Sequence, residues 1–246
     1  MKKTLLIIFI LLFFSASIYA IEISVGPNYQ NLDLSGKIKS NGTEIDIEDQ
    51  LGIGDDEPMG MNARLKVGRH NLVLDLASVD FSGAKTLTEQ IQFEGQTYAV
   101  STYVESKLEY DLYEAQYHYD LLKFNLAGWG VCVSPLFKVS YYEASVSIKG
   151  GGNDESYSEA LPLPSVGAVG QINATKYLSL LAQINGIDYS GDSYIEYKTI
   201  LRIKPLAYLN IDVGYKATEF DYSDSNELLD LDIKGSFFQS SFVYRF

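Results

Sequence analysis

Hydrophobic and polar residues alternate one by one along most of this chain. Residues 61–67 place apolar side chains at every second position, with asparagine, arginine and lysine between them. The same period of two returns in residues 195–204 and 209–218. Because successive side chains of an extended chain point to opposite faces, this period predicts β-strands with one apolar and one polar face.

Ten such segments predict an all-β fold, an up-and-down antiparallel transmembrane β-barrel. Most connections alternate between short turns and longer loops, which is typical of bacterial outer-membrane barrels and puts both termini on the short-turn side. Shifts of the apolar phase blur several boundaries, so eight or twelve strands stay open. The predicted segments are 21–29, 61–67, 72–81, 108–119, 126–148, 161–172, 178–185, 195–204, 209–218 and 233–246.

One phase shift lies in the third segment, where the apolar positions move from Leu76 to Val79. A change of face within a strand predicts a β-bulge, here near Ala77.

Several connections carry their own signals. The long acidic stretch 31–58 contains Lys37–Ile47, whose two short arms flank Asn41-Gly42 and predict a hairpin standing above the surface. The glycine-rich stretch 149–158 predicts a loop, residues 121–125 a short turn, and 221–232 an acidic loop.

The first 20 residues have the layout of a secretory signal peptide. Lys2 and Lys3 precede the apolar run Leu5–Phe14, and small residues lead to a cleavage site after Ala20. A retained N-terminal anchor is the alternative. Further along, no 18 consecutive residues are apolar, which excludes membrane-spanning helices and leaves a barrel for residues 21–246 if the chain spans a membrane.

The last strand alternates aromatic residues up to Phe246, and this pattern resembles the terminal strand of Gram-negative outer-membrane β-barrels. The resemblance implies that Phe242, Tyr244 and Phe246 are recognised by the barrel-assembly machinery. The stretch Ser35–Ile53, SGKIKSNGTEIDIEDQLGI, is similar to that of a group of small outer-membrane proteins without an established activity. The resemblance implies a fold and an outer-membrane location, but no reaction.

A secreted soluble barrel would alternate equally well, with its apolar face inward. Aromatic residues gather near both ends of the predicted strands, as in the girdles at the two membrane interfaces, and favour the membrane. The polar faces of the strands would then line the lumen. The candidate lumen-facing residues are Arg64, Lys66, Glu196, Lys198, Arg202, Asp212 and Lys216.

Charge and residue types narrow the function. The net charge of −13 becomes −15 when Lys2 and Lys3 are removed with the signal peptide, so nucleic acid is excluded as a partner. A single cysteine, Cys132, makes no internal disulfide. The two histidines, His70 and His118, lie at the predicted periplasmic turns, far from the outer-rim acids. We therefore expect no enzyme, no cofactor and no metal site.

The sequence thus predicts an integral outer-membrane barrel with a structural or interaction role through acidic surface loops. Its expected partners are outer-membrane lipid and lipopolysaccharide, in part bridged by divalent cations. A small porin-like channel is the alternative, and a secreted binding barrel is a third reading. If ion pairs seal the lumen, replacing Arg64 and Lys198 with alanine should open a conductance.

Overall fold

A computed structural model describes residues 20–189, 191–223 and 226–246. The predicted signal peptide covers residues 1–20, and all of it except Ala20 lies outside the described residues. In the described part of the chain, no helix is long and apolar enough to cross a membrane.

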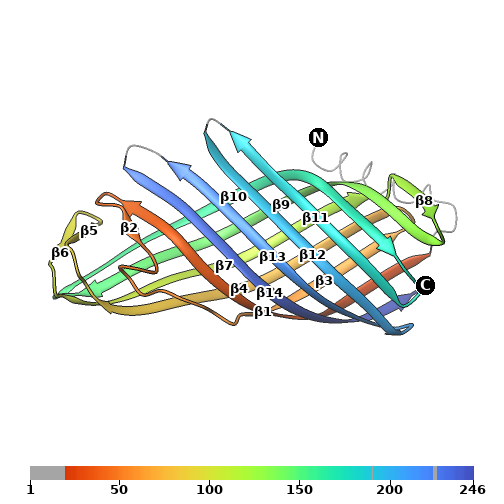
Figure 1. The fold of residues 1–246 in the computed structure, drawn as a ribbon, viewed down its shortest axis with the longest axis horizontal. Helices are drawn as coiled ribbons and strands as arrows, with labels where there is room; N and C mark the ends of the chain where they lie inside the picture. The colour runs from red at the N-terminus through yellow and green to blue at the C-terminus, as the bar shows by residue number, and fades with distance from the viewer. Residues whose placement is uncertain (1–19, 190, 224–225) are drawn as a thin grey trace, which may run out of the picture.

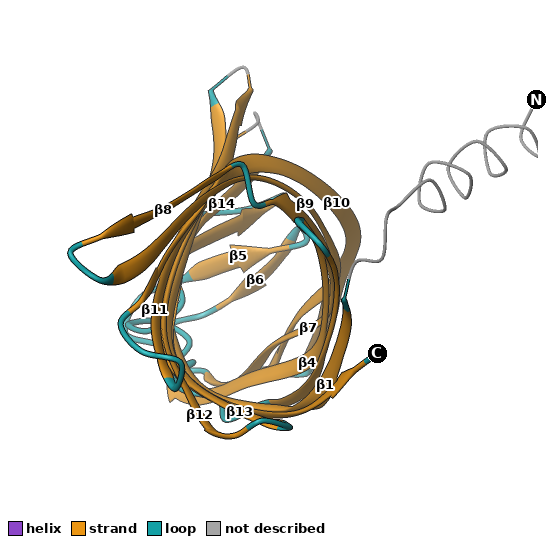
Figure 2. Ribbon diagram, turned by 90° about the vertical axis from the view of Figure 1, so that its right-hand side faces the viewer, coloured by secondary structure: helices purple, strands orange, loops and turns teal. Residues whose placement is uncertain are grey.

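Among the described residues, ten long antiparallel strands form a closed ring, as the alternation predicts (Figure 1). Each strand pairs with the next along the chain, and β14 returns to pair with β1 from Glu22↔Arg245 to Ser40↔Glu227. Figure 2 looks along the ring from the end where the C-terminus lies. The wall strands are β1 (Ile21–Ser40), β3 (Met59–Val67), β4 (His70–Thr86), β7 (Tyr103–Tyr119), β9 (Trp129–Gly150), β10 (Asn153–Asn173), β11 (Leu178–Tyr189), β12 (Asp192–Leu206), β13 (Leu209–Ser223) and β14 (Glu227–Arg245).

The described part of the chain also forms four shorter strands. β2 (Ile45–Asp46) pairs with β1, β5 (Ile91–Phe93) pairs with β6 (Gln96–Tyr98), and β8 (Leu122–Leu126) pairs with β9. In Figure 1, β2, β5 and β6 lie at the end of the barrel opposite the C-terminus, which we call the outer end.

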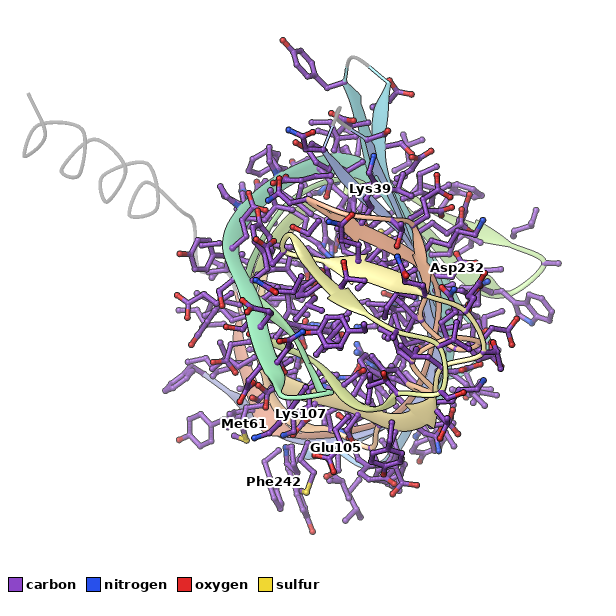
Figure 3. The ribbon with its side chains drawn as sticks, turned by 90° about the vertical axis from the view of Figure 1, so that its left-hand side faces the viewer. Lys39, Met61, Glu105, Lys107, Asp232 and Phe242 are labelled. Carbon is purple, nitrogen blue, oxygen red and sulfur yellow. The ribbon has the colours of Figure 1, made fainter. Side chains whose placement is uncertain are left out.

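An apolar belt surrounds the half of the barrel that carries the termini. Its side chains face outward on all sides of the ring, as a lipid-facing surface requires. Large exposed members are Ile23, Val25, Met61, Leu74, Leu76, Tyr117, Phe137, Val166, Ile184, Leu201, Val213, Phe238 and Phe242. Met61 and Phe242 project away from the wall in Figure 3.

The polarity of the wall inverts between the two halves, and β7 shows this most clearly. Near the termini, Tyr113 and Tyr117 face outward while Glu114 is buried inside. Toward the outer end, Glu105 and Lys107 face outward while Leu108 and its inward neighbours are buried. The strand keeps its alternation throughout, but the apolar face changes from the outside to the inside.

This inversion corrects the predicted bulge near Ala77. The register of β4 with β7 is continuous from His70↔Tyr119 to Thr86↔Tyr103. The apolar phase shifts because Leu76 faces outward in the belt, whereas Val79 and Phe81 face the interior of the outer half.

Several predicted connections are also wrong. Residues 31–40 continue β1, so the segment between wall strands is 41–58 rather than 31–58. The predicted loop 149–158 is the two-residue turn Gly151-Gly152, and 121–125 belongs largely to β8. The positive φ angles of Gly151 and Gly152, 60° and 91°, fit the tight turns that join twisted strands.

Candidate functional site

Four charged side chains from four strands meet inside the half of the barrel that carries the C-terminus. Lys138 Nζ on β9 lies 2.5 Å from Glu114 Oε1 on β7 and 2.7 Å from Glu196 Oε2 on β12. Lys216 Nζ on β13 lies 3.0 Å from Glu196 and 3.5 Å from Glu114. We call these four residues the lumen cluster. Two cations and two carboxylates balance, which compensates the cost of burying each charge.

Polar side chains complete the hydrogen bonding of this cluster. The Ser140 hydroxyl donates to Glu114 Oε1 at 3.2 Å, and the Tyr194 hydroxyl donates to Glu196 Oε2 at 3.2 Å. Strands β7 and β13 are far apart in the ring order, so the Lys216–Glu114 contact spans the lumen. The cluster therefore fills the bore at this level.

A second buried pair lies nearer the termini. The Arg202 guanidinium donates to both Asp212 oxygens, at 2.8 and 2.6 Å, in the bidentate geometry that suits a carboxylate. Arg64 on β3 interacts electrostatically with both members of this pair.

The base of the lumen is organised around Asp120. Its carboxylate accepts hydrogen bonds from Asn71 at 2.9 Å and Ser134 at 3.2 Å. Lys66 and Lys123 lie 2.8 and 2.9 Å from it.

The remaining sequence candidate, Lys198, holds its Nζ 4.9 Å from the centre of the buried Phe237 ring. The structure also brings in Glu114, Lys138 and Asp120, which were not among the candidates. Lys138 had a usable signal, since it shares the inward phase of Ser134 and Ser140 within an otherwise apolar run.

Between the lumen cluster and the outer end, five aromatic rings form a layer across the bore. Consecutive ring centroids are separated by 6.4, 5.7, 5.4 and 5.1 Å, which are contact distances for aromatic pairs. In contact order, this aromatic layer consists of Phe81, Tyr110, Tyr142, Phe220 and Tyr194, from β4, β7, β9, β13 and β12.

The outer half is closed by the chain itself. The predicted hairpin forms, but the segment 41–58 packs inward instead of standing above the surface, because Ile45, Ile47, Leu51 and Ile53 are buried. The β5–β6 hairpin lies across the opening (Figure 3), with Phe93 and Tyr98 buried beneath it. These apolar side chains join those of the wall in one hydrophobic core.

The Tyr98 hydroxyl anchors the second segment, 87–102, by donating to the carbonyl of Ile148 at 2.9 Å. Burial, with Glu155 and Asp154 nearby, raises the pKa of Tyr98.

A cavity of about 410 Å³ lies at the outer end, and we call it the rim pocket. Its volume lies within the roughly 300–1,000 Å³ of small-molecule sites. Leu161 and Leu163 of β10, Ile187 of β11 and Leu229 of β14 line its sides. Tyr194 of the aromatic layer also lines it.

Carboxylates surround this apolar space. Glu159, Asp192, Asp221 and Glu227 are lining residues, and Lys39 is a lining cation. The Tyr157 hydroxyl shares its one hydrogen between Glu159 at 3.0 Å and Glu227 at 3.4 Å, which links β10 to β14 across the pocket. Burial and these two carboxylates raise the pKa of Tyr157 above its ordinary value.

The barrel wall is split beside the rim pocket. β10 pairs with β11 only from Val166↔Gly186 to Asn173↔Ser179. Among the described strands, residues 153–165 of β10 pair with β9 alone. In Figure 1, the β11–β12 hairpin ends at the top of the view, whereas β10 continues toward the left end.

Two prolines agree with this edge. Pro162 and Pro164 have no N–H donor, and such residues are confined to edges and bulges of sheets. Two prolines two residues apart within a strand are a signal in the sequence for such an edge.

The histidines and the predicted assembly signal lie elsewhere. His118 is buried near the base of the lumen beside Gln116, and His70 Nδ1 lies 2.8 Å from the Tyr117 hydroxyl. Phe242 belongs to the belt, and Tyr244 and Phe246 are exposed beyond it at the C-terminus. The recognition of these three residues by the assembly machinery stays a prediction. The described residues contain no group of three or more histidine, cysteine, aspartate or glutamate side chains placed to hold a metal.

Comparison with known proteins supports the fold. No family model and no curated protein matches the chain. The structure of the outer membrane protease OmpT from Escherichia coli superposes with a TM-score of 0.56 at 9% identity, covering 92% of this chain and 97% of that one. Ail of Yersinia pestis follows at a TM-score of 0.41, 12% identity and 92% and 99% coverage. Neisserial surface protein A superposes with a TM-score of 0.36 at 10% identity, covering 91% of this chain and 97% of that one.

At these identities the likeness shows the fold alone. The chain has the architecture of a Gram-negative outer-membrane β-barrel, and the apolar belt agrees with that location. The predicted all-β barrel of about ten strands is confirmed.

Proposed function

We propose that this chain is a closed, non-enzymatic barrel of the outer membrane that acts by binding at its outer end rather than by passing solutes. The observation that carries the proposal is the double closure of the bore by the lumen cluster and the aromatic layer. Barrels of about eight to ten strands are filled by side chains, whereas aqueous channels are typical of about sixteen or more.

The outer wall above the belt supports the binding role. Its outward residues are mainly polar, with acidic members on several strands, including Glu105 and Glu109 on β7, Glu143 on β9 and Asp230 on β14. A surface of this charge suits cationic partners, or lipopolysaccharide phosphates bridged by divalent cations.

Single-channel recording of the refolded mature chain tests the closure. Folding is first verified by heat-modifiable migration on a gel, so that silence cannot come from a chain that did not insert. We expect stable insertion without discrete current steps. Reproducible steps would overturn the closed barrel and favour the small-channel alternative.

Sedimentation with lipopolysaccharide vesicles tests the outer-end role. Barrels embedded in nanodiscs should bind these vesicles in Ca²⁺ and be released by a chelator. A variant in which Glu105, Glu109 and Asp230 are replaced by their amides should bind the vesicles more weakly than the unmodified chain. Equal binding by the variant and the unmodified chain would exclude this acidic surface as the contact.

A further inference from the structure

The rim pocket and a groove on the outside of the wall lie on either side of the split between β10 and β11. A groove of about 550 Å³ lies on the outside of the wall at the base of this split. It is lined on the outside by Phe137, Val166 and Ile195. The groove and the rim pocket share Pro164, Ile187 and Ser193 as lining residues, so only these side chains separate the two spaces at the split.

The position of this junction matters because it lies where the apolar belt ends. Val166, 65% exposed, and Phe137, 49% exposed, are outward belt residues at the groove. One step beyond Val166 toward the outer end, β10 leaves β11. An apolar chain lying in the outer leaflet could thus pass from the belt through the split into the pocket without crossing the polar outer wall.

The lining determines what such a chain can carry. Leu161, Leu163, Leu229 and Phe93 offer an apolar interior, which suits an alkyl chain. The four lining carboxylates and Lys39 leave an excess of negative charge around it. An anionic head group would be repelled there, whereas a hydroxyl or ammonium head could donate to the carboxylates.

We propose that the rim pocket binds the alkyl chain of an amphiphile with a neutral or cationic head group, which enters from the membrane through the split between β10 and β11. This deepens the proposed function, since it gives the outer end of the closed barrel a ligand class. Among the three residues that line both spaces, Ile187 has the largest side chain, and we assign it as the gate of the route.

Photolabelling in lipid vesicles tests the site. The probe is a long-chain alcohol with a diazirine in its chain, mixed into vesicles that contain the refolded mature barrel. After irradiation, mass spectrometry maps the modified residues. We expect labelling of the β10 segment 161–164 and of Leu228 or Leu229, and loss of this labelling when unlabelled alcohol competes.

Two variants and a matched control separate the pocket from the belt. Ile187→Trp blocks the junction and Leu161→Trp fills the pocket, so both should lose pocket labelling. Leu201→Trp makes a similar change on the outward face of β12 and should keep it. The competition on the unmodified chain decides the matter if either variant fails to fold.

Other outcomes overturn the proposal. Labelling spread evenly over the belt, or equal labelling by the carboxylate analogue of the probe, would exclude a selective site. A further preparation holds the barrels in amphipol without lipid and supplies the probe from water. If the pocket is labelled in amphipol but not in vesicles, entry from the membrane is excluded. Electrical silence without pocket labelling would overturn the proposed ligand site and leave the proposed closed barrel standing. Current steps with pocket labelling would overturn the closed barrel and leave the ligand site standing.

Discussion

Lys138 Nζ on β9 lies 2.7 Å from Glu196 Oε2 on β12, although these strands are not neighbours in the ring. Both side chains are at most 2% exposed, so water does not screen the pair. Because the same lysine also binds Glu114, it ties three wall strands together through the lumen.

Removing this lysine should strongly destabilise the barrel. Lys138→Met leaves two buried carboxylates with Lys216 as their remaining cluster cation, and breaking a buried ion pair costs about 3–5 kcal/mol. Urea unfolding in lipid vesicles measures the free energy of unfolding. The control is Lys123→Met, whose half-exposed lysine should cost about 1 kcal/mol or less. Adding Glu196→Gln to Lys138→Met should recover part of the loss; no recovery would contradict a charge effect.

The double variant Arg64→Ala, Lys198→Ala should remain electrically silent. The sequence alone suggested that these cations could seal the lumen. In the structure, neither belongs to the aromatic layer, and the docked segments 41–58 and 87–102 close the outer half independently. Planar-bilayer recording measures this, and discrete steps from the double variant would show that charge pairing is the seal.

The segment 41–58 should leave the barrel when residue 83 gains a side chain. A Cβ at Gly83 would lie 2.4 Å from the backbone of Gly52, where Ile53 bridges to Gly83. We expect Gly83→Leu to accelerate proteolysis of this segment by about tenfold or more, which corresponds to about 1.4 kcal/mol of docking free energy. Gly54→Leu is the matched control, because a Cβ there meets nothing within 4 Å. Equal cleavage of both variants would contradict the docking.

Docking of the segment 87–102 should weaken at alkaline pH. Burial raises the folded-state pKa of Tyr98 above the ordinary tyrosine value of 10.0, so the folded form retains the proton more strongly than the unfolded form. This stabilisation is complete below pH 10 and is lost as pH rises through the folded-state pKa. Hydrogen exchange of residues 87–102 should show that loss. Tyr98→Phe should abolish the alkaline step, and an unchanged step in this variant would assign it to another group.

Part of the fold follows from the sequence because strand alternation is a local property. The period of two around residues 61–67, 195–204 and 209–218 corresponds to β3, β12 and β13. This phase predicts seven lumen-facing residues. Of these, Glu196, Arg202 and Asp212 are buried in the interior, and the other four also lie on the inward phase of their strands.

The partners of these residues could not be predicted, because contacts across a lumen depend on register and closure rather than on local pattern. Glu114 and Lys138 lie on β7 and β9, whose apolar phase shifts obscure which face is inward. The Lys216–Glu114 contact joins residues that only the closed ring brings together.

The sequence by itself determined that the chain forms an antiparallel barrel with alternating faces. Only the tertiary structure decided where each apolar face points. The apolar face of β7 changes sides at Leu112 and Tyr113. Toward the C-terminal end of the barrel, the apolar side chains face outward in the belt. Toward the outer end, they face inward because the segments 41–58 and 87–102 fold into the barrel. Apolar side chains follow whichever side excludes water, and this side is set by chain segments distant in sequence.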